Sequence, residues 1–374
     1  MQSKINVLHI RSSLGRYGPE RNIAALARHV EQYGYRIFLT LVLSPVKGGS
    51  AREALSQHYD LPPERLKIFP GWDPFIIANL CATIRRWDIR LIETHDMRSN
   101  LLGFIASRIT GIPNIANVHG WTRRNIVVRA LEIWDRILLG HCNKVITVSR
   151  SLQLEIGHVP REKIVTIWNA IALEDPPCGD SCEPLSFAQE EGSLAVGAFT
   201  RLSPEKGHSY FLRACAVMPD EFRQLRILLV GDGPLKSELQ KLAAKLGIAE
   251  KVIFTGFRDD AIRIMKSVDV VVVPSLREAC PRQVLEALSL NKAIISTDVG
   301  DVTKIAGGCR NVHIVPKASV EALRMAMVDL LGKKLKGESL SSNGRDRVEE
   351  KFSAPRMARE YAATYRSICE SPGK

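Results

Sequence analysis

Two successive series of short apolar segments, separated by a polar stretch, most constrain how this 374-residue chain can fold. In each series the apolar runs alternate with longer amphipathic segments, which predicts strands alternating with helices in parallel α/β sheets. The first series places strands at Ile5–Ile10, Ile37–Leu43, Leu91–Thr94, Ile115–Val118, Val145–Ser149 and Ile164–Trp168. The second places them at Leu194–Phe199, Ile227–Val230, Val252–Thr255, Val270–Val273, Ala293–Ser296 and Val312–Val315. We therefore expect an α/β protein with two doubly wound domains.

The stretch between the two series, Glu174–Pro184, is rich in proline, glycine and acidic residues and has the composition of a linker. We predict an N-terminal domain over residues 1–172, a linker over 173–192 and a C-terminal domain over 193–350. Two such sheets place a cleft beyond the carboxyl ends of their strands. Residues 351–374 follow, and apolar side chains at helical spacing predict a last helix from about Ala354 to Cys369 with one buried face.

The composition is that of a soluble globular protein, with 45% hydrophobic and 25% charged residues. No run approaches the roughly twenty apolar residues that span a bilayer, and the first residues read as a strand rather than a signal peptide. The eight cysteines lack the spacing of a metal site or a disulfide framework. We therefore expect reduced thiols, no bound metal and a cytoplasmic location.

The net charge of +12 favours acidic partners. No zinc-finger, homeodomain or RNP pattern supports nucleic-acid binding. Basic clusters with apolar neighbours occur at Arg85–Trp87 and Arg123–Arg129. They are consistent with solvated helix faces whose long side chains lie along apolar surface, or with docking on an anionic membrane, and both interpretations stay open.

The segment Pro274–Leu288 has the order buried strand, short loop, helix, because the apolar run Val268–Val273 leads directly into it. Pro281 suits the first helical position, so that the N–H groups of Arg282 and Gln283 point at an anion. Glu278 and Glu286 lie on either side of that anion site. Their carboxylates accept hydrogen bonds only, which suits the hydroxyls of a sugar–diphosphate–ribose ligand.

A second segment, Val196–Gly207, follows a strand with a turn that carries Arg201 and Lys206, and a helix is predicted to begin near Gly207. A guanidinium and an ammonium together suit a diphosphate. An ordinary solvated loop between a strand and a helix would also contain proline, lysine and glycine.

Together these segments resemble the retaining glycosyltransferases of family 4, also called group 1, which have the GT-B fold. Glu278 and Glu286 match the family's E-x7-E motif, and Arg201–Gly207 matches its R-L-x-P-E-K-G segment. Weaker matches follow in the expected order at Leu229–Pro234, Phe254–Phe257 and Asp298–Gly300. The resemblance implies two Rossmann-like domains that face each other across a cleft, with the C-terminal helix crossing back to the N-terminal domain.

The resemblance also implies roles for individual residues. It gives the catalytic set as Arg201, Lys206, Glu278 and His119. The predicted donor-binding set is Gly15, Gly18, Gly231, Gly256, Cys280, Pro281, Arg282, Gln283 and Glu286, in which Cys280 and Arg282 are unusual for the family and suggest donor selectivity. We add His95 and Asp96 as acceptor-side contacts, because they follow a strand that ends at the cleft. Two further positions depart from the family pattern: Tyr17 replaces the first of two adjacent glycines, and Ala279 replaces a glycine, which costs about 1 kcal/mol or more if φ is positive there.

The implied activity is metal-independent, cofactor-free transfer of a hexosyl or hexosaminyl group from a nucleotide-diphosphate sugar, with UDP as the expected nucleotide. The implied acceptor is a saccharide or a lipid-linked saccharide in cell-surface polysaccharide or lipopolysaccharide synthesis. A hydrolysing sugar-nucleotide epimerase and a non-catalytic sugar-nucleotide-binding paralogue are the alternatives. A dinucleotide-dependent oxidoreductase is poorly supported, because Gly231-Asp232-Gly233 lacks the third glycine of that fingerprint.

Overall fold

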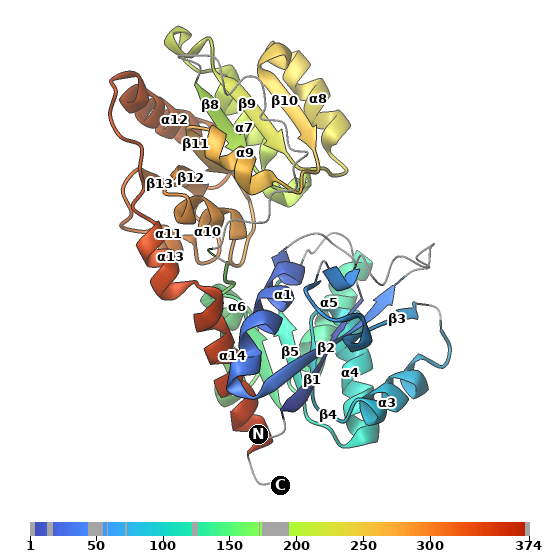
Figure 1. The fold of residues 1–374 in the computed structure, drawn as a ribbon. Coiled ribbons are helices and arrows are strands. Elements are labelled where there is room, and N and C mark those ends of the chain that lie inside the picture. The colour runs from blue at the N-terminus through green and yellow to red at the C-terminus, as the bar shows by residue number, and fades with distance from the viewer. Residues whose placement is uncertain are drawn as a thin grey trace. The chain divides into compact units, whose positions relative to one another are not determined.

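The computed structural model describes residues 4–12, 18–43, 55–57, 59–71, 73–121, 126–171, 173 and 194–370. The chain divides into two compact units (Figure 1). Unit 1 contains Met1–Ala172 together with Phe352–Lys374, and unit 2 contains Leu173–Lys351. Each unit is built on a parallel sheet with helices, so the predicted α/β class with two doubly wound domains is confirmed.

In the described part of unit 1, seven parallel strands lie in the order β3-β2-β1-β4-β5-β6-β7. The strands are β1 Ile5–Arg11, β2 Tyr35–Leu43, β3 Leu66–Pro70, β4 Ile89–Thr94, β5 Asn114–Val118, β6 Lys144–Thr147 and β7 Ile164–Thr166. The helices are α1 Gly18–Val30, α3 Ile76–Arg86, α4 Met97–Thr110, α5 Ile126–Leu139, α6 Arg150–Glu155 and α14 Ala354–Cys369.

The sheet of unit 1 is covered on both faces, because successive side chains of a strand point to opposite sides. On β1, Val7 belongs to one buried cluster, which includes side chains of α1 and α14. The neighbouring Leu8 and Ile10 belong to a second cluster, which includes side chains of α3 and α4. Continuous apolar strands therefore follow from double-sided burial.

The C-terminal helix α14 packs in unit 1, beside α1 (Figure 1). Met357, Tyr361 and Tyr365 are buried in the same cluster as β1 and β2, and Ile368 packs against its edge. The predicted helix and its buried face are confirmed.

In the described part of unit 2, six parallel strands lie in the order β10-β9-β8-β11-β12-β13. The strands are β8 Ala195–Ala198, β9 Arg226–Val230, β10 Val252–Gly256, β11 Val270–Val273, β12 Ala293–Thr297 and β13 Val312–Val315. The helices are α7 His208–Ala216, α8 Lys236–Lys245, α9 Ala261–Ser267, α10 Arg282–Ser289, α11 Val302–Ala306, α12 Val320–Leu335 and α13 Arg345–Lys351.

Both sheets reverse their strand order beside their first strand, between β1 and β4 in unit 1 and between β8 and β11 in unit 2. In open parallel sheets, ligands bind beyond the carboxyl ends of the strands at such a reversal. The fold therefore directs attention to the loops that follow β1, β4, β8 and β11.

The structure differs from the sequence-based expectation at β3, which was not predicted. Among the described strands it pairs only with β2, and it ends at Pro70, so it is an edge strand there, where proline and a mixed polar pattern are tolerated. Within the described ranges, the cysteines are free, and no helix combines the length and apolar character needed to cross a membrane.

Candidate active site

In unit 2, the loops after β8 and β11 are joined to each other by backbone hydrogen bonds. The N–H groups of Leu276 and Arg277 donate to the carbonyl of Glu205 at 2.8 and 3.3 Å. Gly207 adopts φ +67°, and a Cβ there would lie 2.0 Å from the carbonyl oxygen of Pro274. Only glycine allows this approach, so the motif glycine is what brings the two loops together.

The joined loops place Lys206 beside Glu278. Lys206 Nζ lies 2.5 Å from Glu278 Oε1, and both side chains are largely buried, with 18% and 12% of their surface exposed. Ser275 Oγ donates to the same carboxylate oxygen at 3.0 Å. The ammonium therefore lies at the strand reversal, held by a carboxylate whose second oxygen, Oε2, takes part in neither contact.

Helix α10 follows this pair and begins at Arg282. Pro281 is the N-cap residue, with φ −70° and ψ 114°, rather than the predicted first helical residue, because its extended ψ lies outside the helix. No side chain caps the first turn, and Gln283 Oε1 is buried with no hydrogen-bond donor among the described residues. The backbone N–H groups of the uncapped first turn are donors that an anionic ligand can use, whereas Gln283 Oε1 can only accept a hydrogen bond, for example from a ligand hydroxyl.

Within α10, Glu286 is 9% exposed, and its Oε1 lies 3.7 Å from Arg282 Nε. Cys280 is buried just before the helix. Ala279 has no positive φ, so replacing the family's glycine causes no backbone strain at this position.

The two predicted glycines Gly231 and Gly256 lie at the ends of β9 and β10. Gly231 N–H donates to the carbonyl of Gly256 at 2.9 Å. Gly231 has φ +144°, and a Cβ there would lie 2.1 Å from the carbonyl oxygen of Thr200, one residue before Arg201. This glycine therefore sets how closely the neighbouring loop that carries Arg201 can pack.

In unit 1, three imidazoles lie in series: one is inside β1, and the other two follow β4 and β5. We call His9, His95 and His119 the histidine chain. His9 Nδ1 lies 2.8 Å from His95 Nε2, and His95 Nδ1 lies 3.2 Å from His119 Nε2. The rings are stacked, with centroids 5.0 and 5.5 Å apart.

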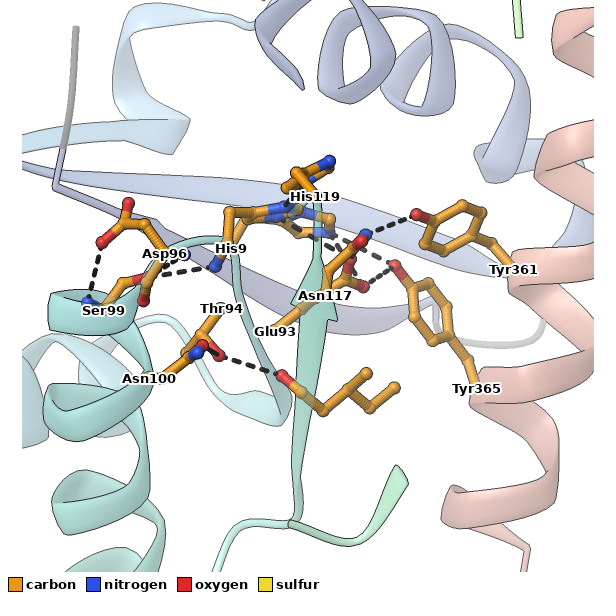
Figure 2. Close-up of polar contacts among 12 residues, drawn as sticks. His9, Glu93, Thr94, Asp96, Ser99, Asn100, Asn117, His119, Tyr361 and Tyr365 are labelled. Carbon is orange, nitrogen blue, oxygen red and sulfur yellow. Dashed lines mark hydrogen bonds and ion pairs between the residues drawn. The ribbon is translucent and has the colours of Figure 1, made fainter. Parts of the chain in front are cut away.

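A buried carboxylate anchors the inner end of this chain. Figure 2 shows Glu93 between strand residues and the tyrosines of α14. Tyr365 Oη donates to Glu93 Oε2 at 2.6 Å, and Asn117 Nδ2 donates to Oε1 at 2.9 Å. Asn117 Nδ2 also contacts Tyr361 Oη at 2.5 Å. Strand pairing places His9 directly opposite Glu93, which explains why their side chains share one face of the sheet.

Burial decides the charges of the histidine chain. It lowers the pKa of His9 and of His119 to about 3, and it lowers the pKa of His95 well below the ordinary value. Burial raises the pKa of Glu93 to about 7, although the hydrogen bonds from Tyr365 and Asn117 oppose the rise. The three imidazoles are therefore neutral at pH 7, and the carboxyl becomes ionised just above that pH.

His9, Glu93 and His95 also have the chemistry of metal ligands, and their ligand atoms all lie within 4.8 Å of one another. Two imidazole nitrogens on one tetrahedral zinc ion would lie about 3.3 Å apart, given bonds of about 2.0 Å. The 2.8 Å between His9 Nδ1 and His95 Nε2 is instead a hydrogen-bond distance. We interpret the group as a hydrogen-bonded network.

The structure brings some predicted site residues together and gives others a structural contact. Lys206 meets Glu278 in unit 2, and His95 meets His119 in unit 1. Asp96 is the N-cap of α4, in a capping box with Ser99. Its other contacts are hydrogen bonds from the backbone N–H and the hydroxyl of Ser12.

Some predicted residues near the start of the chain lie outside the described ranges, and some residues of the site were not predicted. Gly18 begins α1, whereas Gly15 and Tyr17 lie outside the described residues, as does most of the predicted linker. Sequence reasoning did not assign functional roles to His9, Asn117, Tyr361 and Tyr365, and it considered Glu93 only as part of the acceptor-side segment Glu93–Asp96. The available signal was a histidine between the apolar residues Leu8 and Ile10 of the first strand.

Comparisons with known proteins cover nearly the whole chain. The model for glycosyltransferase family 4 matches residues 17–175, and the model for group 1 glycosyl transferases matches residues 193–333. An uncharacterized glycosyltransferase of Methanocaldococcus jannaschii is 26% identical over 95% of this chain and 97% of its own length.

The names of one further relative and one solved structure include a UDP-sugar. The Escherichia coli UDP-Gal:alpha-D-GlcNAc-diphosphoundecaprenol alpha-1,3-galactosyltransferase is 26% identical over 60% of this chain and 61% of its own length. Among solved structures, Anabaena HepE in complex with UDP-glucose matches with a TM-score of 0.80 and 20% identity, over 97% of this chain and 100% of that chain. The latter likeness shows a shared fold.

Proposed function

The chain belongs to the group 1, family 4 glycosyltransferases, and from this premise we propose that it transfers a hexosyl or hexosaminyl group from a nucleotide-diphosphate sugar with retention of anomeric configuration. We infer UDP as the nucleotide, because the E. coli relative is named for a UDP-sugar donor and HepE was solved with UDP-glucose. The proposed acceptor is a saccharide or a lipid-linked saccharide in polysaccharide synthesis, and the E. coli relative is named for a diphosphoundecaprenol-linked acceptor.

The observation that carries this proposal is the Lys206–Glu278 pair at the strand reversal of unit 2. Cleavage of the sugar–diphosphate bond leaves negative charge on the phosphates and positive charge on the anomeric carbon. Lys206 and Arg201 supply positive charge for the leaving group, and the start of α10 adds N–H donors. These groups support a reaction that uses neither a divalent metal nor a cofactor.

The two glutamates divide the rest of the donor in this proposal. Glu278 binds hydroxyls of the sugar, and its ion pair with Lys206 holds the carboxylate in place. Glu286 binds the ribose hydroxyls from inside α10. His119 of unit 1 contacts the sugar. In this proposal, retention results from attack by the acceptor on the face from which the diphosphate leaves.

Product analysis tests this function against its alternatives. The protein is incubated with UDP-, GDP- and ADP-sugars, with and without a lipid-linked saccharide extract, and released nucleotide and sugar products are identified. A transferase releases nucleoside diphosphate slowly from the donor alone and faster with its acceptor. Epimerised sugar formed from the donor alone would instead identify an epimerase, and binding without any release would identify a non-catalytic paralogue.

Helix α5 supports a second part of the proposal, peripheral contact with the membrane that would hold a lipid-linked acceptor. Its outer face exposes Leu131, Ile133, Trp134 and Ile137, each by half or more. Its acidic residues, Glu132 and Asp135, are buried instead.

Asp135 shows why the acids of α5 can point inward. It accepts hydrogen bonds from Asn100 Nδ2 at 2.6 Å and Trp121 Nε1 at 3.0 Å, while burial raises its pKa. An apolar outer face beside the exposed Arg129 fits the interface of an anionic bilayer. The neighbouring Arg123 and Arg124 of the predicted basic cluster lie outside the described residues.

Vesicle sedimentation tests the α5 face. Wild-type protein should bind phosphatidylglycerol-containing vesicles more tightly than pure phosphatidylcholine vesicles, and the double variant Ile133→Ser, Trp134→Ser should lose most of that binding. Met325→Ser in unit 2, at a residue that is 60% exposed, is the matched control and should bind like wild type. Equal binding by the α5 variant and wild type would contradict the membrane contact.

A further inference from the structure

The hydrogen bonds at Glu93 fix the direction of every proton in the histidine chain. A carboxylate only accepts, and Glu93 takes one bond from Asn117 and one from Tyr365. A tyrosine has a single hydroxyl proton, which Tyr365 donates to Glu93. The Oη of Tyr365 therefore faces His9 Nε2, 3.3 Å away, as an acceptor, and His9 is protonated at Nε2.

The same rule assigns the protons of the two remaining rings, His95 and His119. A neutral imidazole has one donor and one acceptor nitrogen, so His9 Nδ1 accepts from His95 Nε2. His95 Nδ1 then accepts from His119 Nε2. The acceptor left over at the end of the chain is His119 Nδ1.

The position of Glu93 gives independent support for this direction. Its carboxylate oxygens lie 3.8 Å from His9 Nε2 and 3.7 Å from His95 Nε2, so both assigned protons face negative charge. The opposite direction would turn two nitrogen lone pairs toward the carboxylate. The hydrogen bonds of Tyr365 and the position of Glu93 therefore favour the same direction independently.

The outer end of the chain differs from the rest in its surroundings. His119 is only partly buried and follows β5, whereas His9 and His95 are buried. No described residue forms a hydrogen bond with His119 Nδ1. A nitrogen lone pair at this position is suited to a hydroxyl donor, the most abundant group on a sugar.

We propose that Glu93, His9 and His95 are positioning residues that hold His119 in the Nε2-protonated form, so that Nδ1 accepts a hydrogen bond from a sugar hydroxyl of the substrate. The hydroxyl partner rests on the proposed glycosyltransferase function, whereas the direction of the chain does not. Because Tyr365 belongs to α14, the C-terminal helix takes part in setting the chemistry of His119.

The charge state of Glu93 sets the conditions for a test. Its pKa is raised to about 7, so the carboxylate form dominates at pH 8.5. The ionisable groups around it are His9 and His95 along the sheet and Tyr361 and Tyr365 on α14. Further out lie Arg11 of β1, which is paired with Glu20 of α1 at 2.7 Å, and Asp96, the N-cap of α4, whose carboxylate accepts from the backbone N–H of Ser99.

The direct test is the long-range ¹H–¹⁵N spectrum of protein labelled with ¹⁵N-histidine, recorded at pH 8.5, with His119 assigned from the missing signals of His119→Asn. Wild-type protein should show a single form of His119, protonated at Nε2. Glu93→Gln should show both forms, because an amide can donate or accept and so leaves both directions open. Tyr361→Phe, which loses only a contact with Asn117, is the control and should match wild type.

Two outcomes would overturn the direction of the chain: Nδ1 protonation of His119 in wild type, or a Glu93→Gln spectrum as uniform as that of wild type. If Glu93→Gln does not fold, the wild-type spectrum and His95→Phe carry the test, since a phenyl ring keeps the stack but interrupts the chain. His95→Phe should expose the His119 Nε2 proton to rapid exchange with water, and an unchanged exchange rate would contradict the proposal.

The hydroxyl partner is tested separately by adding UDP or UDP-glucose to the labelled wild-type protein. UDP-glucose should shift the His119 Nδ1 signal, and UDP should not. If both ligands bind and neither shifts that signal, the sugar contact is wrong although the protein binds nucleotide sugars. If neither ligand stabilises the protein, the proposed donor is wrong, and the direction of the chain stands on the spectra alone.

Discussion

The Lys206→Ala variant examines the step on which the proposed mechanism depends most. The substitution removes the cation that lies 2.5 Å from Glu278, where only 18% and 12% of the two side chains are exposed. At an effective dielectric constant of about 20, two unit charges at this distance attract by about 7 kcal/mol before desolvation is subtracted. The net value is much smaller, because both charges lost water on folding.

Two separable losses follow for Lys206→Ala. Removing one partner of a buried pair costs about 3–5 kcal/mol and of an exposed pair about 0–1 kcal/mol, so we expect unit 2 to lose about 2–3 kcal/mol of unfolding free energy. Loss of a charge that stabilises the leaving diphosphate costs about 3 kcal/mol more in the transition state, or roughly a hundredfold in kcat.

The assay measures nucleotide release with the preferred donor below the melting temperature of each variant, and circular dichroism confirms folding. Lys245→Ala, which removes an exposed lysine from α8, is the matched control and should keep wild-type turnover. Adding Glu278→Gln should restore part of the stability, by about 1–2 kcal/mol, without restoring the rate. Near-normal turnover in folded Lys206→Ala would refute the reasoning.

Three further predictions follow from the same structure. Glu286→Gln should weaken both UDP and the UDP sugar, whereas Glu278→Gln should leave the affinity for UDP nearly unchanged; equal losses by isothermal titration would contradict the division of roles. Between pH 6 and 5, the free energy of unfolding of unit 1 should fall by about 2–3 kcal/mol per pH unit. In the unfolded state all three members of the histidine chain bind a proton near pH 6.5, whereas in the folded state their pKa values are lowered, to about 3 for His9 and His119. This slope includes an opposing contribution of about one proton from Glu93. Its pKa is raised to about 7, so it stabilises the fold at low pH, and that contribution is lost as pH rises through 7. The five tryptophans all precede residue 173, so their fluorescence during urea unfolding reports on unit 1, and a flat pH profile would be inconsistent with the buried neutral rings. Gly207→Ala should cost about 3 kcal/mol and Gly247→Ala about 1 kcal/mol in calorimetry, because the two glycines have similar φ values of +67° and +70° but only the first Cβ would collide with backbone; equal losses would rule out the collision.

The fold could be predicted in most of its elements because the strands are buried on both faces. Double burial requires continuous apolar runs such as Val270–Val273, which are visible without any partner. The edge strand Leu66–Pro70 has one neighbour among the described strands and contains a lysine and a proline, so its pattern does not reveal it. The exact start of helix α10 was also not predictable, because proline at position 281 is suitable both as an N-cap and in the first helical turn.

The candidate site was predictable only where its contacts depend on local sequence. The contacts of Lys206 lie within loops that follow two paired strands, so local sequence was sufficient to nominate them. The network around Glu93 depends on which residue of β1 lies opposite which residue of β4, and on a tyrosine more than 270 positions away in the chain. Register and helix docking are properties of the assembled unit, so His9 and Tyr365 could not be assigned beforehand.

Ligand-induced stabilisation across a panel of UDP-, GDP- and ADP-sugars tests the central claim most directly. A ligand that binds only the folded protein at a hundredfold excess over its Kd adds about 2.7 kcal/mol, which is readily seen as a rise in the melting midpoint. We predict a rise with a UDP sugar that is smaller in Lys206→Ala and unchanged in Lys245→Ala. If no sugar nucleotide raises the midpoint of the wild-type protein, or if Lys206→Ala responds as wild type does, the account of a diphosphate bound at Lys206 is contradicted.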